Sequence, residues 1–281
     1  MSAESIYRSA EKKINKMFFN DYEGAMELFD KAATRFKVEK EYNRAGEAYM
    51  RAGDCAVKCK DEMNACQAYV NAVHAYKKTD LKKAAQLLDI AVRTQIDSNK
   101  LNGAARLEKE FADALCEDGQ SMEAIPHYEK AIEYFNAEDM KMQVKSCTVA
   151  MAKIYGENDM FDKALALYER LGVTCADGPL RHEAKEHFMR AMLCRLATVN
   201  DDNRHEMSDE ASEALRTYMQ RDPYLKNTRE GEFLEMCIEA VEGSDLEKFE
   251  TAVSLLQELR MLDDWKTHVL LAIKRNMDSI R

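Results

Sequence analysis

Alanines recur at intervals of about twenty residues in this 281-residue chain, and this period constrains the fold more than any other feature. The alanine column comprises Ala25, Ala45, Ala65, Ala85, Ala105, Ala124, Ala164 and Ala184. Four residues later come Phe29, Tyr49, Tyr69, Tyr128, Tyr168 and Phe188. Residues four apart lie on the same face of an α-helix, so each pair indicates one helix with a small residue beside a large one. A period of about twenty matches a helix of about fifteen residues plus a turn, and two such units form a hairpin.

Composition supports an all-α fold. The chain holds only 3 prolines and 10 glycines, and it is rich in residues that lose little side-chain freedom in a helix. Clusters of turn-forming residues, such as EDGQS (117–121) and ADGP (176–179), outline about fourteen helices. We expect tetratricopeptide-like helical-hairpin repeats that form a curved, twisted solenoid. Pro126 follows the expected cap Ser121 by several residues and predicts a kink or a late helix start there.

The period weakens after residue 200, where segments such as FETAVSLLQEL replace the alanine and aromatic pairs. We therefore predict a repeat region over residues 1–200 and a C-terminal helical bundle over 201–281. A stack of repeats needs such a cap because its last unit would otherwise expose an apolar face. The only tryptophan, Trp265, is expected to anchor the last helix.

Charge is unevenly distributed along the chain. The net charge is −10, which argues against general binding of nucleic acids, since phosphate neutralisation requires a surplus of Lys and Arg. Residues 229–264 contain eleven acids and three bases, a net of −8, which leaves about −2 for the remainder. Such a cluster favours a basic partner over a merely solvated face.

Cysteine usage predicts a reduced, cytosolic protein. None of the eight cysteines forms C-x-x-C, and most stand among apolar residues, where a free thiol acts as a small hydrophobe. The first residues lack an apolar signal core, and no stretch reaches the eighteen or so apolar residues of a membrane span.

The sequence contains no recognisable catalytic or cofactor-binding motif. Phosphate-binding, dinucleotide-binding and nucleophile-elbow patterns are all missing from it. His182 and His187 stand five residues apart, whereas a helical zinc motif places two histidines four apart on one face. We predict that the protein is not an enzyme and uses neither a metal nor a cofactor.

Recognition is then expected on surfaces. Basic residues recur in the repeat region, at Arg106, Lys109, Lys145, Lys153, Arg181 and Lys185. Stacking could align them into a positive stripe, although ordinary solvated helix backs also explain them. The adjacent Phe18 and Phe19 fit either packing at a bend or insertion into a membrane or partner, because consecutive helical residues diverge by 100°.

Three segments resemble the soluble NSF attachment proteins of the alpha type: ALYERLG (166–172), LRHEAKEHFMRAMLC (180–194) and LDDWKTHVLLAIKRNM (262–277). The resemblance extends over nearly the whole chain. It implies an adaptor for SNARE disassembly, which binds the assembled SNARE four-helix bundle through basic residues. The adaptor then recruits and stimulates the hexameric ATPase NSF and hydrolyses nothing itself.

The resemblance also suggests roles for individual residues. Arg106 and Arg181 match SNARE-contacting basic positions of the family, and Lys145 and Lys153 are looser matches. NSF binding is expected at the acidic C-terminal part, and we assign it to Asp263, Asp264, Asp278 and Ile280. Phe18 and Phe19 take the place of the family's membrane-touching loop, without its glycines. The resemblance thus implies a cytoplasmic protein held at membranes through SNARE complexes.

A generic tetratricopeptide-like scaffold that captures peptide termini, as co-chaperones do, is the alternative. It requires Lys, Arg and Asn to converge in one groove. The basic residues of this chain are spread over many hairpins instead.

Overall fold

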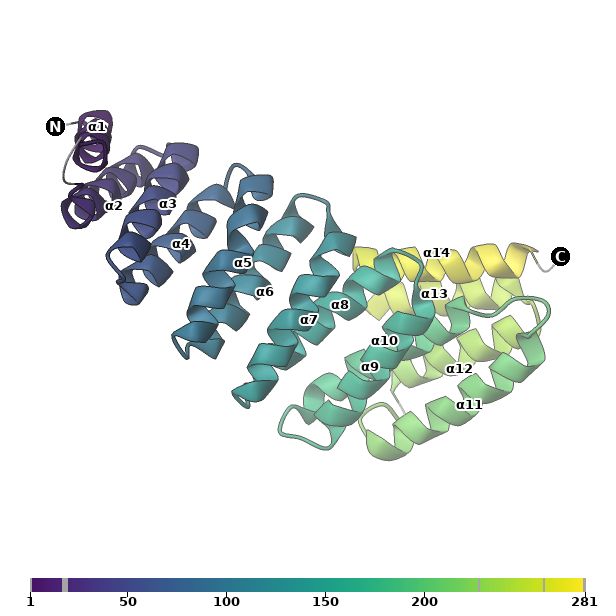
Figure 1. Cartoon of the computed structure of the whole chain (residues 1–281). Coiled ribbons are helices and arrows are strands. Elements are labelled where there is room, and N and C mark those ends of the chain that lie inside the picture. Colours follow the sequence, from purple (N-terminus) through teal and green to yellow (C-terminus); the bar gives the residue numbers. More distant parts are fainter. Residues whose placement is uncertain (1, 17–19, 227, 260, 280–281) are drawn as a thin grey trace. The chain divides into compact units, whose positions relative to one another are not determined.

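A computed structural model describes residues 2–16, 20–226, 228–259 and 261–279. Within these ranges the chain consists of fourteen α-helices and no strand (Figure 1), which confirms the all-α prediction. The helices are α1 Ala3–Ile14, α2 Tyr22–Val38, α3 Tyr42–Lys58, α4 Glu62–Tyr76, α5 Leu81–Asp97, α6 Leu101–Glu117, α7 Ser121–Ala137, α8 Lys141–Glu157, α9 Phe161–Ala176, α10 Arg181–Ala197, α11 Arg204–Arg221, α12 Arg229–Glu242, α13 Leu246–Leu259 and α14 Asp264–Ser279.

The chain divides into two compact units, Met1–Cys147 and Thr148–Arg281. The boundary between these two units falls within α8. The division at residue 200 between a repeat region and a C-terminal bundle stays a prediction. Each unit is described by itself below.

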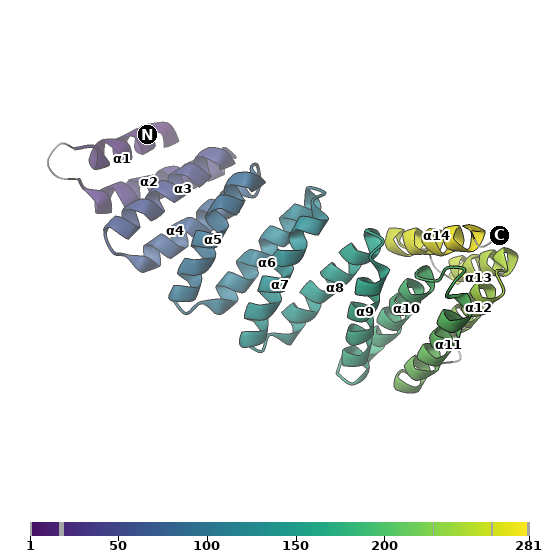
Figure 2. The same ribbon diagram turned by 45° about the vertical axis from the view of Figure 1, so that its right-hand side comes forward.

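The first unit is a row of antiparallel helical hairpins. Each helix packs on the next, and Figure 2 shows α2 to α7 side by side, reversing direction at each turn. Side-chain bonds also join alternate helices. The Tyr7 hydroxyl on α1 donates to Glu47 on α3 at 3.0 Å, and Lys77 Nζ, just after α4, donates to Glu110 on α6 at 2.6 Å.

In the second unit, α9 pairs with α10 and α12 pairs with α13, and α14 returns along the chain to pack on α10. This packing covers the apolar face of the last helix. Val269, Leu270, Ile273 and Met277 of α14 are all buried.

Helix ends repeat with the period of the sequence. Residues with positive φ follow most helices of the hairpin array, at Lys40, Lys60, Asn99, Gly119, Asp139 and Asp159. The amide after each such residue donates to the carbonyl five positions earlier, as Asp61 N does to Ala56 O at 2.9 Å. This left-handed cap ends the helix and reverses the chain, and only one of the six positions uses the glycine that tolerates it best.

The small and large residues of the alanine column meet between successive helices. A Cβ atom on Gly53 of α3 would lie 2.8 Å from the ring of Tyr69 on α4, so only glycine leaves room for the ring. The Tyr69 hydroxyl then donates to Asp54, fifteen residues earlier, at 3.0 Å. Tyr128 on α7 repeats the contact with Asp113 at 2.6 Å, again fifteen residues earlier. Ring packing and a directed hydrogen bond thus set the register of neighbouring helices.

One member of the predicted column is wrong. Ala85 is exposed, and its neighbour Ala84 is fully buried in its place. The cause is the turn between α4 and α5, which has no positive-φ residue. Helix α5 therefore begins at Leu81, nineteen residues after α4 begins at Glu62. After this slip of one residue, the buried small position recurs at Ala104, Ala124, Ala164 and Ala184.

The corrected register gives α6 a carboxylate where other helices place a large apolar residue. Glu108 stands four residues after Ala104 and is fully buried. Its Oε2 lies 2.6 Å from His127 Nδ1 on α7, and its Oε1 lies 3.6 Å from Lys130 Nζ. A buried charge needs such partners, because their loss leaves it unsolvated.

Helix α7 begins at Ser121 and continues through Pro126, so the predicted late start is wrong and Gln120, not Ser121, occupies the capping position. The kink stays a prediction. Burial of Ala124 and Tyr128 on either side outweighs the one backbone bond that proline lacks. Most cysteines are core residues as predicted: Cys55, Cys66, Cys147, Cys175, Cys194 and Cys237 are buried. Burial raises the pKa of the Cys147 thiol to about 11.

Replacing Glu108 tests whether its carboxylate is held by its partners. Glu108→Ala should lower the free energy of unfolding by about 3–5 kcal/mol, because a buried pair loses one member. The double variant Glu108→Leu with His127→Leu gives α6 a leucine at the position where α5 carries Leu88. Its free energy of unfolding should lie within about 1 kcal/mol of that of the parent chain. Urea unfolding followed by circular dichroism measures both, with the exposed Glu129→Ala as control. If Glu108→Ala lowers the free energy of unfolding no more than the control does, the proposed pairing of Glu108 is contradicted.

Candidate interaction surfaces

Three of the predicted basic residues lie in the first unit. Arg106 on α6 is exposed, and its Nε donates to Asn102 Oδ1 at 3.1 Å. Lys109, one turn further on, is half-buried, and its Nζ lies 2.7 Å from Asp113 Oδ2. Asp113 also accepts the Tyr128 hydroxyl, so the charge of Lys109 is tied to helix packing. Lys145 on α8 is half-buried. Arg106 is thus the most accessible cation of the three.

The other three basic residues belong to the second unit. Lys153 on α8 is exposed, with Glu157 3.6 Å away one turn later. Arg181 begins α10, is exposed, and donates through Nε to the Ala176 carbonyl at the end of α9 at 3.2 Å. Lys185 forms a 2.8 Å ion pair with Glu230 of α12. Because the six residues are divided between the two units, a common positive stripe stays a prediction.

The start of α14 docks on three other helices through Trp265, as predicted. Trp265 is 2% exposed, and its Nε1 donates to the Lys153 carbonyl at 3.2 Å. A Cβ on Gly156 would lie 2.5 Å from Nε1, so α8 provides a glycine where the indole lies. Tyr168 of α9 meets the indole edge-on at 5.3 Å, and the Arg190 guanidinium of α10 lies 4.7 Å from its centroid.

Charged side chains around Trp265 complete this contact. Asp263 caps α14 by accepting the Lys266 amide at 2.7 Å, and it forms a 2.6 Å ion pair with Arg190. The buried Lys266 Nζ lies 2.6 Å from Glu186. Burial alone would lower the pKa of Arg190, but Tyr168, Glu186 and Asp263 outweigh it and raise that pKa. Asp263, assigned from the sequence to NSF binding, therefore has a structural role in this unit.

Acidic side chains form a stripe along α12. Glu232, Glu235, Glu239 and Glu242 follow one another at helical spacing, and all four are exposed. Glu239 forms an ion pair with Lys248 of α13. A groove of 260 Å³ between α11 and α12 is lined by three of these glutamates and by Arg216. We call these four residues the α12 acidic stripe.

Other predicted positions are distributed as follows. Asp264 and Asp278 are exposed at the two ends of α14. Phe18, Phe19 and Ile280, the remaining predicted contacts, lie outside the described residues. Sequence reasoning missed the buried Glu108 and Lys266 and the half-buried Arg190, whose charges take part in packing. The only sequence signal for them was the spacing of Glu186 and Arg190, one helical turn apart, which is typical of a surface pair.

Two kinds of feature are absent from the described ranges. No group of three or more His, Cys, Asp or Glu side chains there is arranged to hold a metal ion. Nor does any described helix combine the length and apolar character needed to cross a membrane.

Stacked helical hairpins with charged faces define a helical-repeat protein. The family model of soluble NSF attachment protein, SNAP, matches residues 1–278. The alpha-soluble NSF attachment protein of Vitis vinifera is 31% identical, over 96% of this chain and 92% of that protein. The vesicular-fusion protein SEC17 of Coprinopsis cinerea is also 31% identical, over 98% and 96%. This chain belongs to the soluble NSF attachment protein family.

Among solved structures, a signal-transduction ATPase with a tetratricopeptide-repeat sensor from Pyrococcus horikoshii is 13% identical, with a TM-score of 0.47. The alignment covers 98% of this chain and 44% of that chain. A likeness this distant does not bear on function.

Removing the indole tests how much the α14 contact contributes. Trp265→Ala should lower the free energy of unfolding of the second unit by about 3–5 kcal/mol, because it leaves a cavity among α8, α9 and α10. Leu271→Ala on the same helix, where the side chain is 55% exposed, should cost much less. Circular dichroism during urea unfolding measures both, since the variant has no tryptophan to fluoresce. If both variants lower the free energy of unfolding equally, the indole does not anchor α14.

Proposed function

We propose that this protein is an adaptor for SNARE disassembly. It binds the assembled SNARE four-helix bundle, and it recruits and stimulates the ATPase NSF for vesicle fusion and membrane trafficking. Membership of the soluble NSF attachment protein family supports this proposal. The absence of catalytic motifs from the sequence accords with an adaptor that hydrolyses nothing itself.

The observation that carries the proposal is the presence of exposed basic residues on two repeat helices and of an exposed acidic stripe on a later helix. Arg106 on α6 and Arg181 at the start of α10 are exposed, and so are the four glutamates of the α12 acidic stripe. Opposite charges on different helices suit two partners of opposite charge, and such complementarity provides specificity and rapid association. The basic residues would grip an acidic SNARE bundle, and the acidic part would face the ATPase.

Within the predicted SNARE-binding set, the side chains differ in how much charge they can offer. Lys109 and Lys185 already form ion pairs at 2.7 Å and 2.8 Å with residues of their own units. Arg106 donates to the neutral Asn102, and Arg181 donates to a backbone carbonyl, so no carboxylate offsets the positive charge in either of these bonds. We therefore assign the strongest SNARE contacts to Arg106 and Arg181.

Membrane attachment is proposed to be peripheral. The SNARE complex would hold the adaptor at the membrane, and Phe18 and Phe19 would add a contact with lipid. Each buried aromatic ring contributes roughly 1.5–3 kcal/mol, enough to assist a tethered complex but not to anchor a lone protein.

Charge reversal tests the SNARE-binding role. The double variant Arg106→Glu with Arg181→Glu should weaken binding to a preassembled SNARE complex at least about 100-fold, which corresponds to ~2.7 kcal/mol. Affinity of the parent chain should fall as salt rises, because the contact is electrostatic. Arg216→Glu, at an exposed arginine of α11, is the matched control and should bind like the parent. Unchanged binding of a folded double variant in a pull-down titration would refute the assignment.

Truncation tests the NSF-binding role of the C-terminus. Met277 is 1% exposed, so the cut should spare it and remove only residues 278–281. The truncated chain should bind SNARE complex normally but stimulate NSF less, since Asp278 and Ile280 are lost. Reconstitution with NSF, ATP and a SNARE complex measures both ATP hydrolysis and disassembly. Full stimulation by the truncated chain would show that these residues are dispensable.

A further inference from the structure

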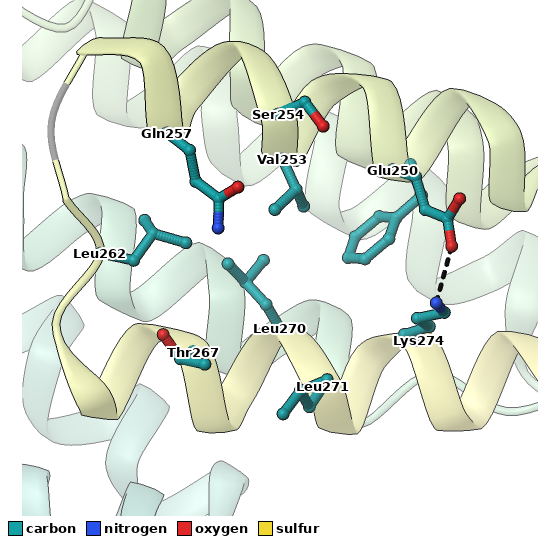
Figure 3. Close-up of a pocket in the computed structure, with 10 residues that line it drawn as sticks. Glu250, Val253, Ser254, Gln257, Leu262, Thr267, Leu270, Leu271 and Lys274 are labelled. Carbon is teal, nitrogen blue, oxygen red and sulfur yellow. Dashed lines mark hydrogen bonds and ion pairs between the residues drawn. The ribbon is translucent and has the colours of Figure 1, made fainter.

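An apolar groove opens between α13 and α14 (Figure 3). Its volume is 340 Å³, at the lower end of the roughly 300–1,000 Å³ of small-ligand pockets. Its apolar lining consists of Phe249, Val253, Leu262, Leu270 and Leu271. Phe249 and Leu270 are buried at 2% and 4% exposure, whereas Leu271 remains 55% exposed.

The groove stays open because its two helices are held from opposite sides. Helix α13 packs mainly on α12, and α14 packs mainly on α10. Trp265 and Lys266 fix the start of α14 through the Lys153 carbonyl and Glu186, which lie on α8 and α10. Neither of these two contacts involves α13, so neither closes the space between α13 and α14.

Polar groups frame the apolar lining. Lys274 Nζ of α14 lies 2.6 Å from Glu250 Oε1 of α13 and bridges the two helices at one end of the groove (Figure 3). This hydrogen bond lowers the pKa of Glu250 and raises that of Lys274, so both remain charged at neutral pH. The Gln257 side chain points toward the groove near its other end. An occupant would thus meet apolar walls between an ion pair and an amide.

Among the described residues of α13 and α14, exposed acids outnumber exposed bases. Glu247 and Glu258 of α13 and Asp264 and Asp278 of α14 are exposed, against Arg275 of α14, while the half-buried Lys274 is paired with Glu250. These carboxylates would attract an apolar side chain that is flanked by basic residues and would repel one that is flanked by acidic residues. An amphipathic helix of a partner can present such a ligand, with an apolar side chain in the groove and Lys or Arg beside it.

We propose that the α13–α14 groove binds an apolar side chain that NSF presents between basic residues. The inference rests on the proposed function, which supplies NSF as the partner, and it adds an apolar anchor to the charge contacts of the C-terminal part. Buried apolar anchors at the centre of an interface typically carry most of its binding energy, whereas exposed charge pairs at the rim contribute little.

Two variants alter the groove, and a third is a matched control. Leu271→Ala removes an exposed wall of the groove, and Ser254→Phe fills it with a ring from an exposed position of α13. Leu255→Ala makes the same change as Leu271→Ala at a leucine of 47% exposure that does not line the groove. Circular dichroism and thermal unfolding check that all three variants fold like the parent.

Binding of each variant to purified NSF hexamer is measured with SNARE complex and a non-hydrolysable ATP analogue. We expect Leu271→Ala and Ser254→Phe to weaken NSF binding about tenfold, or ~1.4 kcal/mol, and Leu255→Ala to stay within about twofold. SNARE binding without NSF should be unchanged in all three. If Leu271→Ala, Ser254→Phe and Leu255→Ala all bind NSF like the parent, the groove proposal is wrong while the adaptor function stands. If the parent chain itself fails to bind NSF, the proposed function fails, and the groove proposal fails with it.

Discussion

Aromatic rings lying on glycine hold successive helices of this protein together. Tyr69 covers Gly53, and in the second unit Phe188 covers Gly172, where a Cβ would lie 2.5 Å from the ring. Trp265 repeats the arrangement on Gly156, between helices far apart in the sequence. Interiors are close-packed, so a methyl group at any of these glycines would have to push two helices apart. The spacing of the helices at these three contacts depends on the missing methyl group.

Many carboxylates near the recognition residues also serve the fold. Asp113 joins a tyrosine hydroxyl to Lys109, and Asp263 joins a helix cap to Arg190. Such double contacts fix side chains that would otherwise be free to meet a partner. We therefore propose that recognition falls to exposed residues outside these two networks, such as Arg106.

Much of the fold could be predicted from periodicity, because one buried stripe per helix determines both helix number and turn position. The slip at Ala85 could not, since Ala84 and Ala85 are adjacent alanines and either one fits the pattern. The burial of Glu108 was also hidden, because it depends on His127 from the next helix. Site residues were harder to predict: charge type is visible in a sequence, but Asp263 shows that the partner of a charge is not.

Left-handed caps every twenty residues also make the helices equal. Helices α2, α3, α5, α6, α7 and α8 each contain 17 residues, or about 25 Å of rise. Neighbouring axes of packed helices lie about 8–10 Å apart, so these helices present their side chains at a nearly constant spacing, which the shorter α4, of 15 residues, interrupts. A rod-shaped ligand that ran across these helices would meet side chains at a nearly constant spacing. Insertions would be tolerated in the turns, but an insertion within a helix would disrupt that spacing.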